Sequence, residues 1–410
     1  MKKLMLSIAL LAATLTVSAQ QPEQLPCDPN VRYGQLDNGL TYYICHNEQP
    51  KQRCEFHIAQ AVGAVLEEDN QNGLAHFLEH MAFNGTQHFP GKGIIEYFES
   101  VGVNFGGNIN AYTSIDETVY RLSDVPTYRD GIVDSALLVM HDWACGLLLE
   151  GDEIDAERGV IREEWRTGRT ADRRLWKEIR AKKYPGSQYA KRDVIGDTAV
   201  INNFAYDALR AYYHKWYGPD NQAIIVVGDI DVDQIEQKIK ALWADVPARE
   251  NRGERPLYTV EDNTAPLIAI ALDPEAQSTR IELEYKHPQI PAEYRNTMPA
   301  YMQTVVNNLI TDMMDNRFEE LSLNPNASFL GAGCYYGEIV KLKDAFVAVS
   351  IPKEGQETAA LKDLLLQVEK MHRYGFTNAE LERVKTEYLN NMEKAYNERN
   401  NRKNRAIAQE

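Results

Sequence analysis

One stretch near the N-terminus carries three closely spaced side chains that can bind a metal ion or a proton: Gly73-Leu-Ala-His76-Phe-Leu-Glu79-His80-Met-Ala-Phe-Asn-Gly-Thr86. On an α-helix, His76 and His80 lie one turn apart on the same face, and Glu79 lies beside them. Their side chains therefore converge on one point. The sequence predicts a helix here that presents two imidazoles and one carboxylate together.

The order H-x-x-E-H suits a catalytic zinc site. Zinc in such a site takes three protein ligands and keeps a position open for water, and a neighbouring carboxylate removes a proton from that water. The pattern supplies two ligands and a base in the reverse order of the commoner H-E-x-x-H helix. The alternative is two partly buried histidines on an amphipathic helix, with Glu79 solvated.

A second acidic segment offers the missing third ligand. It lies within a helix predicted over residues 152–182, with Asp152 as its N-cap, and reads Ala156-Glu-Arg-Gly-Val-Ile-Arg-Glu-Glu-Trp165. Glu157 and Glu164 are seven residues apart and so share a helix face. An acidic pair of this kind can also be merely solvated.

The order of predicted elements indicates an α+β fold. We expect strands over 33–45, 54–62, 118–122 and 222–228, an extended run over 103–114, and helices over 93–101, 130–146, 204–217 and after Asp231. The charged segment 249–263 has no periodicity. Beyond it we expect strands over 267–272, 280–285 and 329–351, and helices over 293–321, 357–374 and from 378 to the end. The recurring order predicts duplicated two-layer domains, each a mostly antiparallel sheet covered by helices: 27–250, the linker 251–263, and 264–410.

Residues 1–19 read as a secretory signal peptide, with a basic start, an apolar run and Val17-Ser18-Ala19 before the expected cleavage. We therefore expect an exported, soluble protein that is periplasmic or extracellular in a bacterium, with no membrane span. The formal net charge of −16 argues against nucleic acid as a partner. Of the five cysteines (27, 45, 54, 145 and 334), Cys45 and Cys54 are candidates for a disulfide, and the absence of any disulfide is equally compatible with the pattern.

Several motifs together resemble the pitrilysin, or insulinase, family of inverzincin metallopeptidases. They are the Gly73–Thr86 stretch, Asn110-Ala-Tyr-Thr113, Glu157-Arg-Gly-Val-Ile161 and His214-Lys-Trp-Tyr-Gly-Pro-Asp-Asn221, which precedes the strand ending Val227-Gly-Asp229. The similarity extends over residues 30–250. The resemblance therefore covers the whole of the first predicted domain.

The resemblance implies specific roles for these residues. It makes Glu157 the third zinc ligand and Glu164 a glutamate that supports the site without binding the metal. If the alignment with the family motif is shifted, Glu150, Glu153 and Glu163 are the other candidates. It also implies that an extended substrate adds as a strand along Asn110, Ala111, Tyr112 and Thr113. Family members close as a clamshell of two halves, whereas this chain reaches only partway through a second, non-catalytic domain. We therefore expect a fragment of a longer protein or a partner subunit that completes it.

The function predicted from the sequence is zinc-dependent hydrolysis of peptide bonds in peptides or unfolded polypeptides. His76, His80 and Glu157 hold one Zn²⁺ per chain, and Glu79 is the general base. The alternative is a peptide-binding or assembly subunit of the same fold without turnover. A hydrolase that uses manganese or iron on the same ligands is a third interpretation.

Overall fold

The computed structural model describes residues 22–248 and 254–410, so the predicted signal peptide lies outside the described residues. The chain forms two compact units. The N-terminal unit comprises residues 28–248, 254–279, 338–344 and 389–410, and the C-terminal unit comprises residues 22–27, 280–337 and 345–388. These divisions fall at different places from the predicted domain limits. Val260, within the segment predicted to be a linker, is buried in the core of the N-terminal unit.

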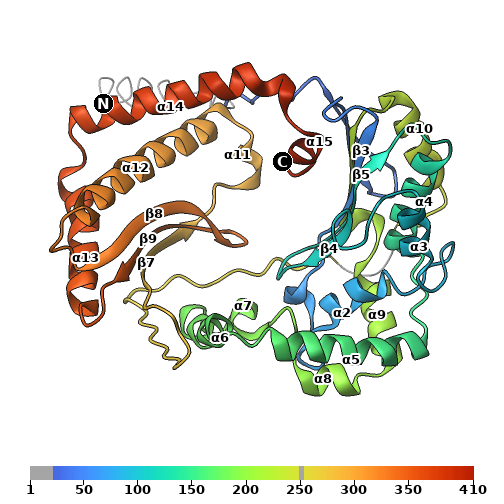
Figure 1. Ribbon diagram of the computed structural model, residues 1–410, viewed down its shortest axis with the longest axis horizontal. Helices are drawn as coiled ribbons and strands as arrows, with labels where there is room; N and C mark the ends of the chain where they lie inside the picture. The colour runs from blue at the N-terminus through green and yellow to red at the C-terminus, as the bar shows by residue number, and fades with distance from the viewer. Residues whose placement is uncertain (1–21, 249–253) are drawn as a thin grey trace, which may run out of the picture. The chain divides into compact units, whose positions relative to one another are not determined.

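A six-stranded sheet forms the centre of the N-terminal unit (Figure 1). Its order is β1-β2-β6-β3-β5-β4, and every neighbouring pair is antiparallel except β2 and β6. The strands are β1 (Val31–Gln35), β2 (Thr41–His46), β3 (Arg53–Gln60), β4 (Ile109–Thr113), β5 (Thr118–Pro126) and β6 (Gln222–Gly228). β4 is therefore the last strand at one edge of the sheet.

Helices bury one face of this sheet. Their bounds are α2 (Leu74–Met81), α3 (Gly93–Ser100), α4 (Ile132–Cys145), α5 (Gly151–Thr167), α6 (Ala171–Lys183), α7 (Gln188–Lys191), α8 (Thr198–Asn203), α9 (Tyr206–Trp216) and α10 (Val232–Leu242). α4 packs on β3 and β5, and α2 packs on β4. Alternate strand residues such as Phe56 and Ile58 pack into one core with Phe77 of α2 and Trp143 of α4. On the opposite face, the short helix α15 (Asn404–Ala408) packs on β3 and β6.

The C-terminal unit repeats a sheet-and-helix arrangement on a smaller scale. Three strands in the order β7-β9-β8 form its sheet, and they are β7 (Ile281–Pro288), β8 (Phe329–Val340) and β9 (Lys343–Pro352). Its helices are α11 (Ala292–Arg295), α12 (Met298–Ser322), α13 (Glu357–Tyr374) and the first half of α14 (Asn378–Glu398). Met314 and Phe318 of α12 pack with Ala348 of β9 and Leu364 of α13. The predicted α+β class with mostly antiparallel, helix-covered sheets is confirmed.

Three predicted helices are interrupted. The helix predicted over 152–182 divides into α5 and α6, because Gly168 ends the first and Thr170 caps the second by accepting a hydrogen bond from the Arg173 amide. The helix predicted over 293–321 is broken before α12, where Thr297 caps in the same way. The helix predicted from 378 to the end stops at Glu398, and α15 follows separately.

The strand predicted over 267–272 is wrong. Residues 264–272 belong to no strand, and Ile268, Ile270 and Leu272 are exposed. The alternation of apolar residues in this segment is typical of a strand, but no neighbouring strand pairs with it in the described part of the chain. A pattern of period two cannot form a strand without a hydrogen-bonding partner.

The proposed Cys45–Cys54 disulfide is also wrong. All five cysteines are free. β6 lies between β2 and β3, so Cys45 is opposite Val227 and Cys54 is opposite Gly228 rather than each other. Cys54 belongs to the main core, whereas Cys45 packs near α15 on the other face of the sheet.

None of the helices in residues 22–248 and 254–410 is long and apolar enough to cross a membrane.

Candidate metal and catalytic site

The histidine helix α2 begins at a tightly constrained turn. Gly73 precedes it with a φ of 107°, and a Cβ there would lie 2.8 Å from the Cα of Gly196 and 2.7 Å from the Cδ1 of Ile201. Only glycine fits this left-handed, crowded position. Glu67 then closes the helix start, because its carboxylate accepts hydrogen bonds from the amides of Gly73 at 2.9 Å and Ala75 at 2.8 Å. These contacts fix the direction in which α2 leaves the turn.

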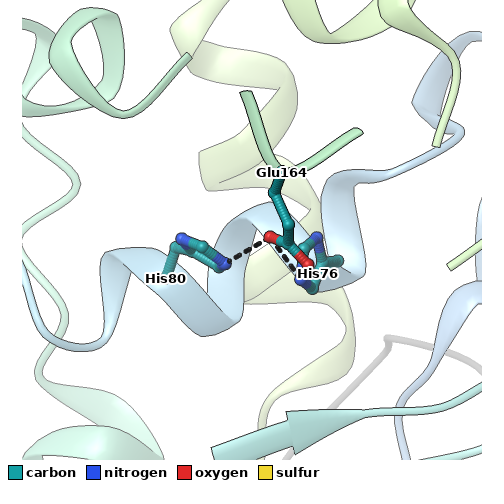
Figure 2. Close-up of side chains that lie close together, drawn as sticks. All are labelled: His76, His80 and Glu164. Carbon is teal, nitrogen blue, oxygen red and sulfur yellow. Dashed lines mark ion pairs between the residues drawn. The ribbon is translucent and has the colours of Figure 1, made fainter. Parts of the chain in front are cut away.

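Two imidazoles on α2 face one carboxylate on α5 (Figure 2). The Oε2 atom of Glu164 lies 3.6 Å from Nε2 of His76 and 3.4 Å from Nε2 of His80. Two ligand atoms at tetrahedral angles around a zinc ion are about 3.4 Å apart. The donor set of two imidazole nitrogens and one carboxylate oxygen, at these separations, fits a single zinc ion.

Glu157 takes a different position from Glu164. Its Oε1 atom lies 2.7 Å from Nδ1 of His80, the ring nitrogen that does not face Glu164. Its Oε2 atom accepts a hydrogen bond of 2.6 Å from the side-chain amide of Asn84, and Asn84 in turn contacts Lys92. A carboxylate on the outer nitrogen of a metal-binding histidine orients the ring and fixes its tautomer. The geometry thus favours an exchange of the roles predicted for the two glutamates.

Burial and charge act differently on the two imidazoles. Burial and the nearby charge of His80 lower the pKa of His76 to about 4, so its ring is neutral at pH 7. Burial also opposes the charged form of His80, but its hydrogen bonds with Glu157 and Glu164 outweigh that effect and raise its pKa to about 9. The Nδ1 atom of His76 is buried without a hydrogen-bond partner among the described residues. Two carboxylates therefore favour positive charge at His80.

Glu79 lies on the same helix and is held from the sheet edge. Its Oε2 atom accepts a hydrogen bond of 2.5 Å from the hydroxyl of Thr113, the last residue of β4. Burial raises the pKa of Glu79. A carboxylate with a raised pKa, positioned beside metal ligands, is suited to accept and return a proton. The site therefore combines a candidate base with candidate ligands.

The four residues predicted to bind substrate form the edge strand. Asn110, Ala111, Tyr112 and Thr113 pair only with β5 in the described sheet, with Ala111 opposite Tyr120. Tyr112 is exposed, whereas Asn110, Ala111 and Thr113 are half-buried. β4 thus leads along the sheet edge to Glu79.

The competing glutamates lie elsewhere. Glu163 forms an ion pair with Arg166, and Glu150 is the residue before α5 while Glu153 lies in its first turn. Sequence reasoning missed three contributors: Glu67, Asn84 and the contact of Thr113 with Glu79. Glu67 and Asn84 flank the histidine helix in the sequence, yet their roles depend on backbone amides and a carboxylate that only the fold brings near them.

Comparisons with known proteins agree with this architecture. Residues 42–192 match the family model described as "Insulinase (Peptidase family M16)". Residues 203–388 match the family model described as "Peptidase M16 inactive domain". A crystal structure of the first half of the periplasmic protease PqqL from Escherichia coli is 30% identical, with a TM-score of 0.81, and the match covers 94% of this chain and 82% of that one. The chain belongs to the M16 insulinase family of peptidases.

Longer M16 relatives extend beyond this chain. The probable zinc protease PqqL of Escherichia coli is 32% identical over 393 residues, which are 95% of this chain and 41% of the relative. The Haemophilus influenzae protein of the same name is 31% identical over 385 residues, or 92% of this chain and 40% of the relative. The longer crystal structure of Escherichia coli PqqL has a TM-score of 0.86. The chain therefore spans about two fifths of the length of these curated relatives.

Proposed function

We propose that this chain carries the catalytic site of a zinc metalloendopeptidase that hydrolyses peptides or unfolded polypeptides. The observation that carries the proposal is the convergence of His76 and His80 of α2 with Glu164 of α5. Glu79 lies on α2 together with the two histidines. Relatives named as zinc proteases support it. The metal would be a single Zn²⁺ per chain, held by His76, His80 and Glu164, with Glu157 orienting His80.

Peptide hydrolysis at this site would use the metal, a base and the edge strand in separate roles. Bound zinc would supply a Lewis acid that makes water more acidic and polarises the peptide carbonyl. Glu79 takes the proton from the attacking water and delivers it to the leaving amine. Thr113 holds Glu79 in position through its 2.5 Å hydrogen bond. The edge strand β4 would pair with an extended substrate and align its backbone past Glu79.

The proposal includes export and a missing second half. The predicted signal peptide, together with a relative described as a periplasmic protease, supports a periplasmic location. Because this chain spans about two fifths of its relatives, we propose that a C-terminal half or a partner subunit closes over the site. Such a closure would exclude water and orient the substrate.

The deciding experiment measures zinc content and hydrolysis of quenched fluorescent peptides, for this chain and for Glu79→Gln. The proposal expects one zinc per chain in both proteins, and cleavage by the parent alone. Cleavage by Glu79→Gln at the parent rate would show that Glu79 is not the general base. Zinc binding without cleavage by either would indicate that the second half is required, and the assay would then be repeated with that half added. Manganese or iron in protein purified without added metal would contradict the choice of zinc.

A further inference from the structure

A pocket of about 440 Å³ lies within the N-terminal unit, and its lining includes the residue that follows the edge strand β4. We call it the α6 pocket, and the residues that matter to its chemistry are Ser114, Asp116, Arg173, Lys177, Arg180 and Asp193. Ser114 directly follows Thr113, which contacts Glu79. A peptide that follows β4 past Glu79 would therefore reach this pocket next.

One face of α6 supplies the cations of the pocket. Arg173, Lys177 and Arg180 are separated by four and three residues, which places them in one stripe along the helix. Arg180 is the most enclosed, because only 7% of its side chain is exposed. Its Nε atom has no hydrogen-bond partner among the described residues. A buried guanidinium nitrogen without an acceptor is costly, and it leaves a donor available to a ligand.

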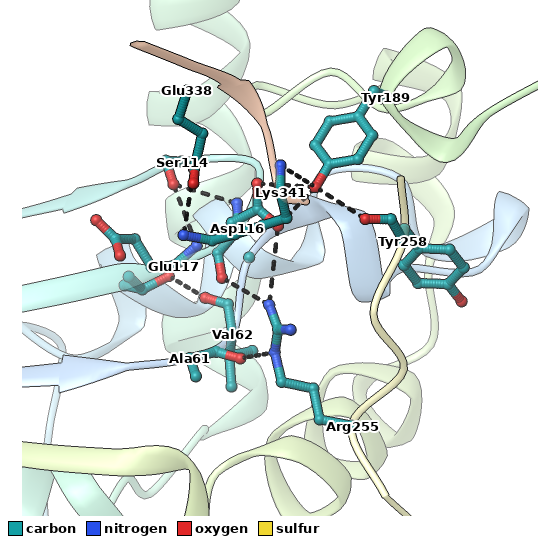
Figure 3. Close-up of polar contacts among 12 residues, drawn as sticks. Ala61, Val62, Ser114, Asp116, Glu117, Tyr189, Arg255, Tyr258, Glu338 and Lys341 are labelled. Carbon is teal, nitrogen blue, oxygen red and sulfur yellow. Dashed lines mark hydrogen bonds and ion pairs between the residues drawn. The ribbon is translucent and has the colours of Figure 1, made fainter. Parts of the chain in front are cut away.

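The acidic residues of the pocket are largely compensated by cations that do not line it. Asp116 accepts a hydrogen bond of 3.0 Å from the Tyr189 hydroxyl and lies 3.8 Å from the guanidinium of Arg255 (Figure 3). The carboxylate of Glu338 lies 3.3 Å from the ammonium of Lys341. Arg255 and Lys341 are both outside the pocket lining.

Only one acid of the lining remains to balance the α6 cations. Asp193 is shared between Arg173, at 3.6 Å, and Arg180, at 3.4 Å. Among the described residues, no ion pair or hydrogen bond involves the ammonium of Lys177. Three cations thus face one carboxylate, and the pocket keeps a positive surplus inside a protein of net charge −16.

We propose that the α6 pocket binds a carboxylate of the peptide substrate, with Lys177 and Arg180 as its partners. This inference rests on the proposed function and adds a substrate preference to it. The carboxylate can belong to an acidic side chain near the scissile bond or to the free C-terminus of the peptide. Guanidinium and ammonium groups in a partly enclosed site bind carboxylates more strongly than they do in bulk water.

The test measures binding rather than turnover, so that it does not depend on catalysis. Zinc-loaded Glu79→Gln chain is titrated with fluorescein-labelled peptides, followed by fluorescence anisotropy. One arm uses C-terminally amidated peptides in which a single Gln at a time is replaced by Glu. The other arm compares the all-Gln peptide with an amidated and with a free C-terminus. We expect about tenfold tighter binding when the carboxylate occupies the right place, in one of the two arms.

Substitution of Lys177 tests whether the carboxylate preference arises in the α6 pocket. Lys177→Gln in the Glu79→Gln background should abolish most of the preference for the carboxylate peptide. Lys191→Gln is the matched control, since Lys191 is an exposed lysine of the neighbouring α7 that does not line the pocket. It removes the same charge and should leave the preference intact.

The outcomes separate this inference from the proposed function. Equal affinities in both arms, no binding of any peptide, or a preference unchanged by Lys177→Gln would overturn the pocket assignment. A parent chain that lacks zinc-dependent cleavage even with its second half would overturn the proposed function instead. The carboxylate preference would be measured in either case.

Discussion

The Oε1 atom of Glu157 lies 2.7 Å from Nδ1 of His80, the ring nitrogen that does not face Glu164. This contact leaves Nε2 of His80 directed at Glu164, 3.4 Å away. The two glutamates come from the same face of α5, two turns apart, and meet opposite nitrogens of one ring. The two nitrogens of His80 therefore give the two glutamates different positions: Glu164 lies where a metal ligand would, and Glu157 lies where it can orient the ring.

Measurements of zinc affinity should distinguish the roles of Glu157 and Glu164. Glu164→Gln removes a proposed ligand and should weaken zinc binding more than about 100-fold, whereas Glu157→Gln removes an orienting contact and should cost about 10- to 100-fold. Competition with a chromophoric chelator measures both. Glu163→Gln, an exposed neighbour paired with Arg166, is the control and should bind zinc as the parent does. A larger loss in Glu157→Gln than in Glu164→Gln would restore the assignment made from the sequence.

The hydrogen bond from Thr113 to Glu79 should matter for turnover but not for metal binding. Thr113→Val keeps the shape of the side chain and removes the hydroxyl, so the Glu79 carboxylate loses its fixed position. We expect kcat to fall by about ten- to a hundredfold, with unchanged zinc content. Thr113→Ser retains the hydroxyl and should recover most of the rate. If valine and serine behave alike in peptide hydrolysis, the contact has no role in positioning the base.

The turn before the histidine helix should tolerate no side chain. Gly73→Ala would place a methyl group 2.8 Å from the Gly196 backbone at a φ of 107°. Strain and overlap together should lower the free energy of unfolding by about 2–4 kcal/mol. Urea denaturation followed by circular dichroism measures the change. Gly107→Ala is the control, because a Cβ there has nothing within 4 Å, and a loss of similar size in that variant would argue against the steric account.

Acid should weaken the N-terminal unit partly through Glu236. Its hydrogen bonds with Tyr42, Lys240 and Arg32 lower its pKa from 4.5 to about 2. Because the folded-state pKa lies below the unfolded one, the stabilisation is present above about pH 4.5 and is lost as the pH falls toward 2.

Glu236→Gln should therefore be less stable than the parent at neutral pH, and the difference should shrink between pH 4.5 and 2. Urea unfolding midpoints measured across this range check the prediction. The exposed Glu96→Gln serves as the control and should follow the parent throughout. A difference between parent and Glu236→Gln that does not change with pH would assign the effect to packing rather than to ionisation.

Much of the secondary structure follows from local sequence. The periodicity of apolar residues predicted the helices near 93–101 and 130–146, and Asp231 was placed at the start of α10, whose Gln234 amide it caps. The breaks at Gly168–Thr170 and before α12 were missed, although both contain a threonine cap. Apolar periodicity continues across a cap, so the pattern alone does not reveal a break.

Pairings between distant segments were not predictable in the same way. Cys45 and Cys54 lie on consecutive strands, and only the insertion of β6 from residues 222–228 separates them. The segment 267–272 has the alternation of a strand but no partner strand in the described structure. Both errors arise because strand pairing depends on which segment arrives alongside, not on the strand itself.

The sequence by itself determined the histidine helix, because the positions of His76, Glu79 and His80 depend only on the 3.6-residue repeat of a single helix. It also offered Glu157 and Glu164, which share one face of α5, as candidates for the third ligand, with Glu150, Glu153 and Glu163 as competitors. Glu157 and Glu164 are equivalent in that local geometry, since seven residues return to the same face. Only the tertiary structure distinguished them, because the way α5 packs on α2 sets which carboxylate meets each nitrogen of His80.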